Sequence, residues 1–236
     1  MNQTDIETSP ASESGEECPE SQRPRRIFIV DNHPVVRHGL RSIMEGVHDL
    51  LVCGEAETVG EARSAIVHLQ PDAVVCDISL NQFEGIELVR SVRAHHPELP
   101  ILVYSTQDEE LYAERMLSVG ANGYIMKDAS SETLLGALRR VLSGQPYVSA
   151  AVGNSIVLRH TKRRTEPTDP MERLSTREVQ VLLMIGKGMT TRETAQALHL
   201  SVKTIESHRQ RIRHKLNLSN GSQLLRFAMT DIQKRA

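Results

Sequence analysis

Residues 174–218 read LSTREVQVLLMIGKGMTTRETAQALHLSVKTIESHRQRIRHKLNL, and this stretch decides the fold of the C-terminal part of the chain. It contains two capping boxes, at 175–178 and 190–193, in which a hydroxyl and a carboxylate can satisfy the open backbone N–H groups of a helix start. Gly188 follows the first apolar segment and can take the left-handed conformation that ends a helix. Ser201 provides a third cap. The stretch therefore predicts a helix, a turn and a second helix, followed by a basic third helix.

The helix after Ser201 has one apolar side and one polar side. At about 100° per residue, Ile205 and Ile212 fall together with Val202 nearby, and this side is expected to pack on the core of the module. The polar side can pair with base edges or phosphates, which favours binding to double-stranded DNA over a merely solvated helix face. The candidates for bases are Lys203, Glu206, Ser207, Gln210, Arg211 and His214, and those for phosphates are Arg192, Ser201, Thr204 and Lys215.

This stretch resembles the LuxR-type helix-turn-helix of the NarL/FixJ family of response regulators, whose pattern is L-T-x-R-E, then G, then E-I-A, then S-x-x-T-V-x-x-H. The matching residues are Leu174 to Glu178, Gly188, Glu193, Ala195, Leu198, Ser201, Thr204, His208, Lys215 and Leu216. Thr194 stands where the family usually has Ile, and Ile205 where it usually has Val. The resemblance implies base contacts at Glu206, Ser207 and Gln210. In that family, lysine is common at the positions of Glu206 and Gln210, so the DNA sequence that this chain recognises stays open.

Charge is divided unevenly along the 236 residues. The net charge is −2, but residues 161–236 hold 15 Lys and Arg against 7 Asp and Glu, a net +8 that leaves −10 for the rest. A basic module on an acidic partner fits DNA binding that the front half modulates. Residues 1–24 carry six acidic side chains and few apolar ones, which predicts a disordered acidic tail. The alternative is an acidic arm that competes with DNA for the basic module.

The cysteines indicate a reducing compartment. Cys18, Cys53 and Cys76 lie far apart, in no pattern typical of disulfides or zinc sites. No apolar run approaches 18 residues, and the acidic N-terminus does not resemble a secretion signal. We expect a cytoplasmic protein with no membrane span.

Short apolar runs alternate with amphipathic segments from Arg26 to about residue 145, a pattern typical of a parallel α/β sheet. We expect strands at 27–30, 50–53, 73–76, 101–104 and 123–126, with helices at 34–45, 60–69, 85–94, 109–119 and 131–142. The expected fold class is α/β, a flavodoxin-like doubly wound five-stranded parallel domain over 25–145 with strand order 2-1-3-4-5. A helix and linker over 146–172, with the helix at 147–158, precede a small all-α domain over 173–236.

Polar side chains stand where four of these strands end. Asp31 and Asn32 follow the first strand, Asp77 the third, Ser105 the fourth and Lys127 the fifth. Ligands bind beyond the carboxyl ends of such strands, and the strand order brings Asp31 and Asp77 together. Oxygen ligands of this kind suit Mg²⁺, which can hold a phosphoryl group in line with a carboxylate nucleophile, here Asp77. Lys127 and Ser105 can contact the phosphoryl oxygens.

Each of these side chains also has an ordinary explanation: Asp77 could be a loop acid, Lys127 a surface lysine and Ser105 a helix-start residue, and Tyr124 within the fifth strand could belong to the core. Their joint position at four strand ends favours a site. We expect His33 to be structural and not a ligand.

Residues 26–145 resemble a response-regulator receiver domain, on the motif Asp77-Ile-Ser-Leu, Gly85 eight residues later, Ser105, and Gly123-Tyr-Ile-Met-Lys127. The resemblance implies that a histidine kinase phosphorylates Asp77 with Mg²⁺. It also implies that Tyr124 swings inward once Ser105 has moved.

Two residues depart from the receiver pattern. Asn32 stands where a second acid usually ligates Mg²⁺ directly; its amide can offer only a neutral carbonyl oxygen. Asn81 stands where proline is common.

The main hypothesis is a transcription regulator in which phosphorylation of Asp77 releases or dimerises the DNA-binding module. Leu224, Leu225 and Phe227 could form a homodimer seam or be buried within the module. One alternative is a constitutive DNA-binding protein with the receiver as a dimerisation scaffold, motivated by Asn32. Another is a phosphatase-like hydrolase, although Asp77-Ile-Ser lacks the second acid of a DxD site. We expect no enzyme activity beyond self-phosphorylation and autodephosphorylation.

Overall fold

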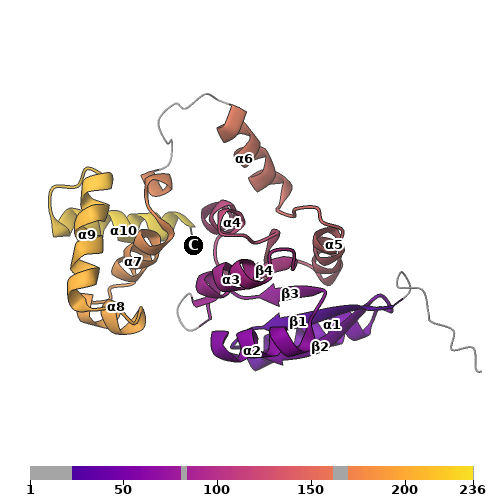
Figure 1. Cartoon of the computed structure of the whole chain (residues 1–236). Helices are drawn as coiled ribbons and strands as arrows, with labels where there is room; N and C mark the ends of the chain where they lie inside the picture. Colours follow the sequence, from indigo (N-terminus) through magenta and orange to yellow (C-terminus); the bar gives the residue numbers. More distant parts are fainter. Residues whose placement is uncertain (1–22, 81–83, 162–169, 236) are drawn as a thin grey trace, which may run out of the picture.

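A computed structural model describes residues 23–80, 84–161 and 170–235. Its N-terminal part is a five-stranded parallel sheet in the order β2-β1-β3-β4-β5, as expected (Figure 1). The strands are β1 (Arg25–Val30), β2 (Leu50–Ala56), β3 (Ala73–Cys76), β4 (Ile101–Ser105) and β5 (Gly123–Met126). The central strands are almost continuous apolar runs, because both faces of the sheet are covered.

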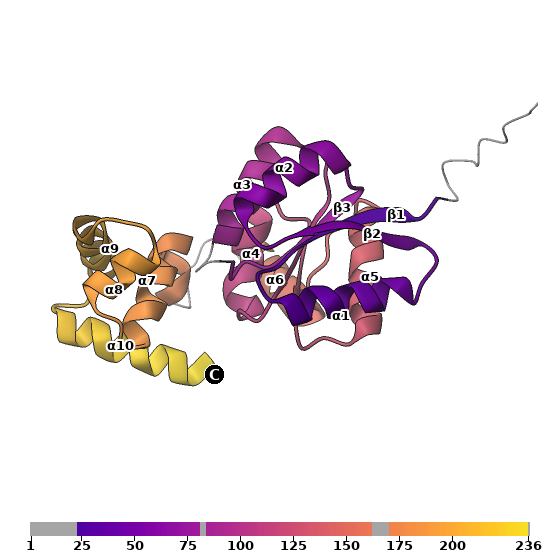
Figure 2. The ribbon, with the colours of Figure 1, turned by 90° about the horizontal axis from the view of Figure 1, so that it is seen from below.

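Helices cover both faces of the sheet (Figure 2). They are α1 (Pro34–Glu45), α2 (Val59–Leu69), α3 (Glu84–His95), α4 (Glu109–Ser118) and α5 (Ser131–Leu142). Alternate residues of the strands point to opposite faces and divide the core in two. Ile27 and Ile29 pack with α1 and α5, whereas Phe28 and Val30 pack with α2, α3 and α4.

Two elements depart from their expected bounds by three residues, and the other predicted strands and helices of this part agree within two. β2 continues to Ala56 through Gly54, past the end of its apolar run, because it follows β1 through a register shift at Ile27/Phe28. The sixth helix, α6 (Ala150–Thr161), begins three residues late because Tyr147 bridges to Gly123 and extends the sheet edge.

The C-terminal part is the expected small helical module. After a short 3-10 helix, η2 (Pro170–Arg173), come α7 (Thr176–Gly186), α8 (Thr191–Ala197), α9 (Val202–Lys215) and α10 (Gly221–Arg235). Both capping boxes form with reciprocal hydrogen bonds, and Ser201 caps α9. Gly188 follows α7 with a φ of 81°. Val202 was expected on the core side, but it begins α9 and is 41% exposed.

Part of the sequence lies outside the described residues. This applies to almost all of the acidic tail, to Asn81, and to residues 162–169 of the expected linker. In the described part of the chain, no helix is long and apolar enough to cross a membrane.

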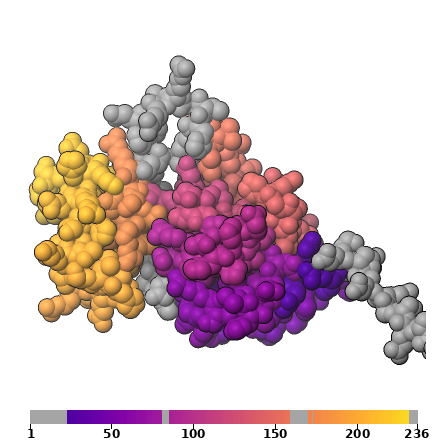
Figure 3. All heavy atoms as spheres, in the orientation of Figure 1, coloured from indigo at the N-terminus to yellow at the C-terminus, as the bar shows by residue number. Residues whose placement is uncertain are grey.

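The two parts touch through α4 and the start of the helical module (Figure 3). The guanidinium of Arg115 on α4 donates to the carbonyls of Leu174 and Met171, both at 2.7 Å. The docking therefore uses η2 and the entry to α7. In Figures 1 and 2, α9 lies at the end of the molecule away from the receiver.

Candidate functional site

The polar strand ends meet as the sequence predicts. The ammonium of Lys127 donates to Asp31 Oδ2 at 2.6 Å and to Asp77 Oδ2 at 2.8 Å. The carboxylates are 2% and 1% exposed and the lysine side chain 9%. Three charged groups from the ends of three strands thus form one buried cluster.

Lys127 compensates the two carboxylates. Burial lowers its pKa, but the hydrogen bonds and charges of Asp31 and Asp77 outweigh burial and raise the pKa above the ordinary value. The ammonium therefore stays charged. Removing it would leave two buried carboxylates side by side.

The backbone around Asp77 is held closely. The N–H of Ser79 donates to Asp77 Oδ1 at 2.9 Å and orients the carboxylate. A Cβ added at Gly85 would lie 2.2 Å from the carbonyl oxygen of Asp77 and 2.5 Å from Cα of Ile78. The glycine at this spacing is required because α3 begins directly against the loop that carries Asp77.

The two switch candidates are fully buried. Tyr124 donates to the carbonyl of Gln107 at 2.7 Å, and neither Tyr124 nor Ser105 has any exposed surface. Burial raises the pKa of the Tyr124 phenol far above its usual range, against a smaller opposite effect of its hydrogen bond with Ser105. The ring thus already occupies the inward position that the resemblance links to phosphorylation.

Gln107 is a residue that sequence reasoning missed. Its side chain donates to Ser79 Oγ at 3.3 Å, and its carbonyl accepts from Tyr124. It connects the loop of Asp77 with the switch tyrosine. Its only sequence signal is its place two residues after Ser105 at a strand end.

The cluster offers ligands suited to a divalent cation. One ligand atom each from Asp31, His33 and Asp77 lies within 4.8 Å of the others. Asn32 Oδ1 is buried and has no hydrogen-bond partner among the described residues. An amide oxygen can be satisfied only by a donor or a cation, so the donor set fits a divalent ion despite the lost carboxylate.

The polar face of α9 has the opposite character. Its base-contact candidates are all exposed: Lys203, Glu206, Ser207, Gln210, Arg211 and His214. The last four of these, with Lys215, line an open hollow of about 430 Å³. We call the surface formed by these six exposed side chains the reading face. Arg192, at the start of α8, is also exposed.

Some phosphate candidates have partners inside the module. Lys215 donates to Glu178 of the α7 capping box at 2.6 Å, and the hydroxyls of Ser201 and Thr204 are 2.8 Å apart. Burial raises the pKa of Glu178, but the bonds from Lys215 and Ser175 outweigh it and lower the pKa. Lys215 therefore joins α9 to α7, a role that the sequence did not indicate.

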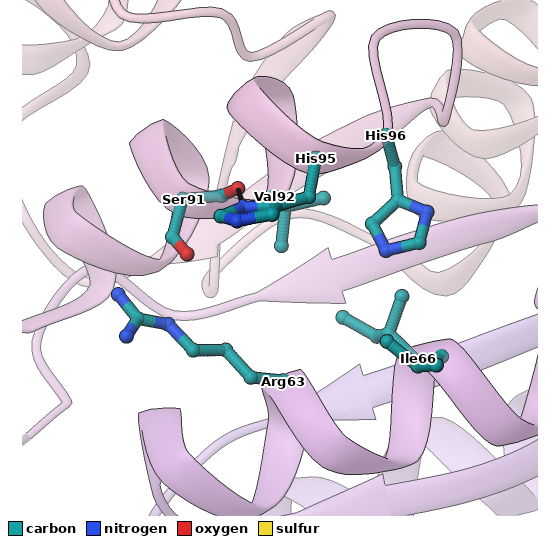
Figure 4. A pocket seen from close by; sticks show the side chains of 7 residues that line it. Arg63, Ile66, Ser91, Val92, His95 and His96 are labelled. Atoms are coloured by element: carbon teal, nitrogen blue, oxygen red, sulfur yellow. Dashed lines mark hydrogen bonds between the residues drawn. The ribbon is translucent and has the colours of Figure 1, made fainter.

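The hollow in Figure 4, of about 300 Å³, is separate from the cluster. It lies between Arg63 on α2 and Ser91, His95 and His96 around the end of α3. The cluster lies where α3 begins, so this hollow has no part in the chemistry at the strand ends.

Comparisons with known proteins place both parts. The receiver domain of response regulators matches residues 27–139, and the domain of the bacterial regulatory proteins of the LuxR family matches 172–228. The oxygen regulatory protein NreC of Staphylococcus haemolyticus is 34% identical over 209 residues, 86% of this chain and 96% of its own. The chain belongs to the NarL/FixJ family of response regulators. It is a phosphorylation-controlled transcription regulator with a LuxR-type DNA-binding output.

Solved structures show the same fold. RcsB of Salmonella enterica serovar Typhimurium, in a structure bound to a promoter, is 24% identical with a TM-score of 0.65, covering 87% of this chain and 98% of its own. A LuxR-family response regulator from Aurantimonas is 30% identical with a TM-score of 0.55, covering 59% and 99%. The match to a receiver domain with a DNA-binding output gives no support to the phosphatase-like alternative.

Proposed function

We propose that Asp77 is the phosphoacceptor and that a histidine kinase is the donor. The supporting observation is the buried cluster in which Lys127 bridges Asp77 and Asp31. A carboxylate oxygen of Asp77 attacks the phosphorus of phosphohistidine, the P–N bond breaks, and the imidazole nitrogen leaves with its electron pair and takes up a proton.

The surrounding residues have distinct tasks in this proposal. Ser79 N–H orients the carboxylate of Asp77, and Lys127 follows the negative charge onto the phosphoryl oxygens. Ser105 lies at the end of the neighbouring strand to donate its hydroxyl. Asp31, Asn32 and Asp77 would hold Mg²⁺, which supplies charge neutralisation on the phosphoryl group when bound.

We further propose that phosphorylation acts by pairing DNA-binding modules and not by uncovering them. The reading face is exposed while Arg115 holds the module on the receiver. Leu225 and Met229 on α10 are 38% and 44% exposed and provide a homodimer seam, whereas Leu224 is buried in the module. Paired modules would read half-sites of double-stranded DNA about one turn apart.

The test phosphorylates the purified chain with acetyl phosphate and Mg²⁺, followed by intact mass, oligomeric state and binding to random DNA duplexes. We expect one phosphoryl group, dimer formation and tighter DNA binding together. Asp77→Asn should abolish all three, and Asp128→Asn, an exposed acid just after Lys127, should preserve them. Phosphate uptake by the Asp77→Asn protein would refute the assignment.

The scaffold alternative is not favoured. Lys127 is hydrogen-bonded to both Asp77 and Asp31 despite Asn32, and Ser105 is buried at the end of the neighbouring strand. Unchanged oligomeric state and DNA affinity after complete phosphorylation would revive it. We place the protein in the cytoplasm, on the separated cysteines and the expected DNA target.

A further inference from the structure

The loop after β1 presents an imidazole to the cation site. His33 Nδ1 lies 3.1 Å from Asp31 Oδ1, and the backbone N–H of His33 donates to the same oxygen at 2.8 Å. The His33 side chain is 62% exposed, so the ring can turn without disturbing the core. The residue that the sequence suggested was structural is therefore next to the acids.

The neighbouring Asn32 has an amide oxygen that no hydrogen bond from the described residues satisfies. Its Oδ1 is buried without a hydrogen-bond partner in the described part of the chain. Such an atom costs free energy unless a donor or a cation satisfies it. In the sequence Asn32 lies between Asp31 and His33, whose ligand atoms lie within 4.8 Å of each other and of one from Asp77, a set of two oxygens and one nitrogen.

We infer that His33 is a metal ligand that replaces the carboxylate missing at Asn32, and that the site prefers a divalent transition-metal ion such as Mn²⁺ to Mg²⁺. The inference rests on the proposed function for the role of the site. Mg²⁺ favours oxygen ligands and keeps its waters, so an imidazole contributes little to it. First-row transition ions accept imidazole more readily than Mg²⁺ does, and Mn²⁺ is the one of them that also suits carboxylate and carbonyl oxygens.

Lys127 sharpens the preference. It already compensates both carboxylates, so an incoming ion gains less from Asp31 and Asp77 than it would in a site without the lysine. The neutral donors Asn32 and His33 are therefore the ones that distinguish ions. Of these two, only His33 offers nitrogen.

The test titrates the unphosphorylated full chain with Mn²⁺, counting free Mn²⁺ by electron paramagnetic resonance, and repeats it with Mg²⁺ as competitor. We expect Mn²⁺ to bind at least about tenfold more tightly than Mg²⁺, and His33→Ala to remove about tenfold from Mn²⁺ affinity alone. His38→Ala, an exposed histidine of α1, is the matched control. Asn32→Asp should shift the preference back toward Mg²⁺.

A spectroscopic readout tests the coordination directly. Electron spin-echo modulation of bound Mn²⁺ should show a directly coordinated nitrogen in the unaltered protein and none in His33→Ala. Absence of this nitrogen signal, or an unchanged Mn²⁺ to Mg²⁺ ratio in His33→Ala, overturns the inference. Because binding is measured without phosphorylation, this result is independent of whether Asp77 accepts phosphate.

Discussion

The strand-end cluster and the reading face use the same kinds of side chain in opposite ways. In the cluster, Lys127, Asp31 and Asp77 are buried and pair with one another. On α9, Lys203 and Arg211 are exposed to solvent. In the buried cluster, a change of charge alters the stability or conformation of the receiver itself. On α9, the exposed charges remain available to bind DNA phosphates.

The largest difference between the two regions should appear in stability. Lys127→Met leaves Asp31 and Asp77 buried without a counter-charge, so we expect a loss of about 3–5 kcal/mol in receiver stability in the presence of EDTA. All four tyrosines lie between residues 104 and 147, so tyrosine fluorescence during urea unfolding reports the receiver. If the receiver lost no more stability than removal of an exposed ion pair costs, the buried cluster and the exposed reading face would not differ in their effect on stability.

The second effect concerns the reading face. Gln210→Ala should weaken binding to a DNA site selected from random duplexes by about 1–3 kcal/mol and relax the preference at one base pair. Stability should not change, because Gln210 is exposed. Gln145→Ala, an exposed glutamine of the receiver, is the control. Equal weakening on every DNA sequence would assign Gln210 to the backbone instead.

A third prediction concerns Glu178, a buried acid of the DNA-binding module. Glu178 has a lowered pKa, so its stabilisation is present above its ordinary value of 4.5 and is lost as the pH falls through the lower folded value. Glu178→Gln should cost the module about 1–2 kcal/mol at neutral pH and flatten this acid dependence.

The stability of the DNA-binding module is measured by circular dichroism. Its unfolding is the transition that tyrosine fluorescence does not report, because all four tyrosines lie outside the module. Glu193→Gln in the exposed second capping box should have a smaller effect. If both variants behaved alike, the bond from Lys215 to Glu178 would contribute nothing.

The smallest effect should come from Lys203→Met, the exposed counterpart of Lys127→Met. We expect a stability change within about 0.5 kcal/mol. The slope of DNA affinity against salt concentration should fall by about one if the lysine contacts a phosphate, and stay constant with relaxed specificity if it reads a base. Competition with unselected DNA separates the two outcomes.

The fold followed from the sequence wherever one signal acted locally. The apolar runs of β3 and β5 and the caps of α7 and α8 gave their positions directly. The bridge from Tyr147 to Gly123 was missed because it joins residues far apart in the sequence, and the local periodicity used to predict the helix carries no information about such pairing.

The site was predictable as residues but not as contacts. Strand ends and topology bring Asp31 and Asp77 together, but spacing cannot reveal that Lys127 binds both. Gln107 was missed because its role depends on where the loop after β4 turns. Val202 was wrongly predicted to face the core. A helical wheel considers only angular position and ignores that Val202 is the first residue of α9, where it remains exposed.

The exposed reading face on a receiver-docked molecule has a kinetic consequence. A basic helix open to solvent attracts DNA through charge whether or not Asp77 carries phosphate. Unphosphorylated molecules would then already scan the chromosome by sliding and hopping when a signal arrives. The delay between signal and promoter occupancy would be set by how quickly two scanning molecules meet, and the response would steepen with copy number.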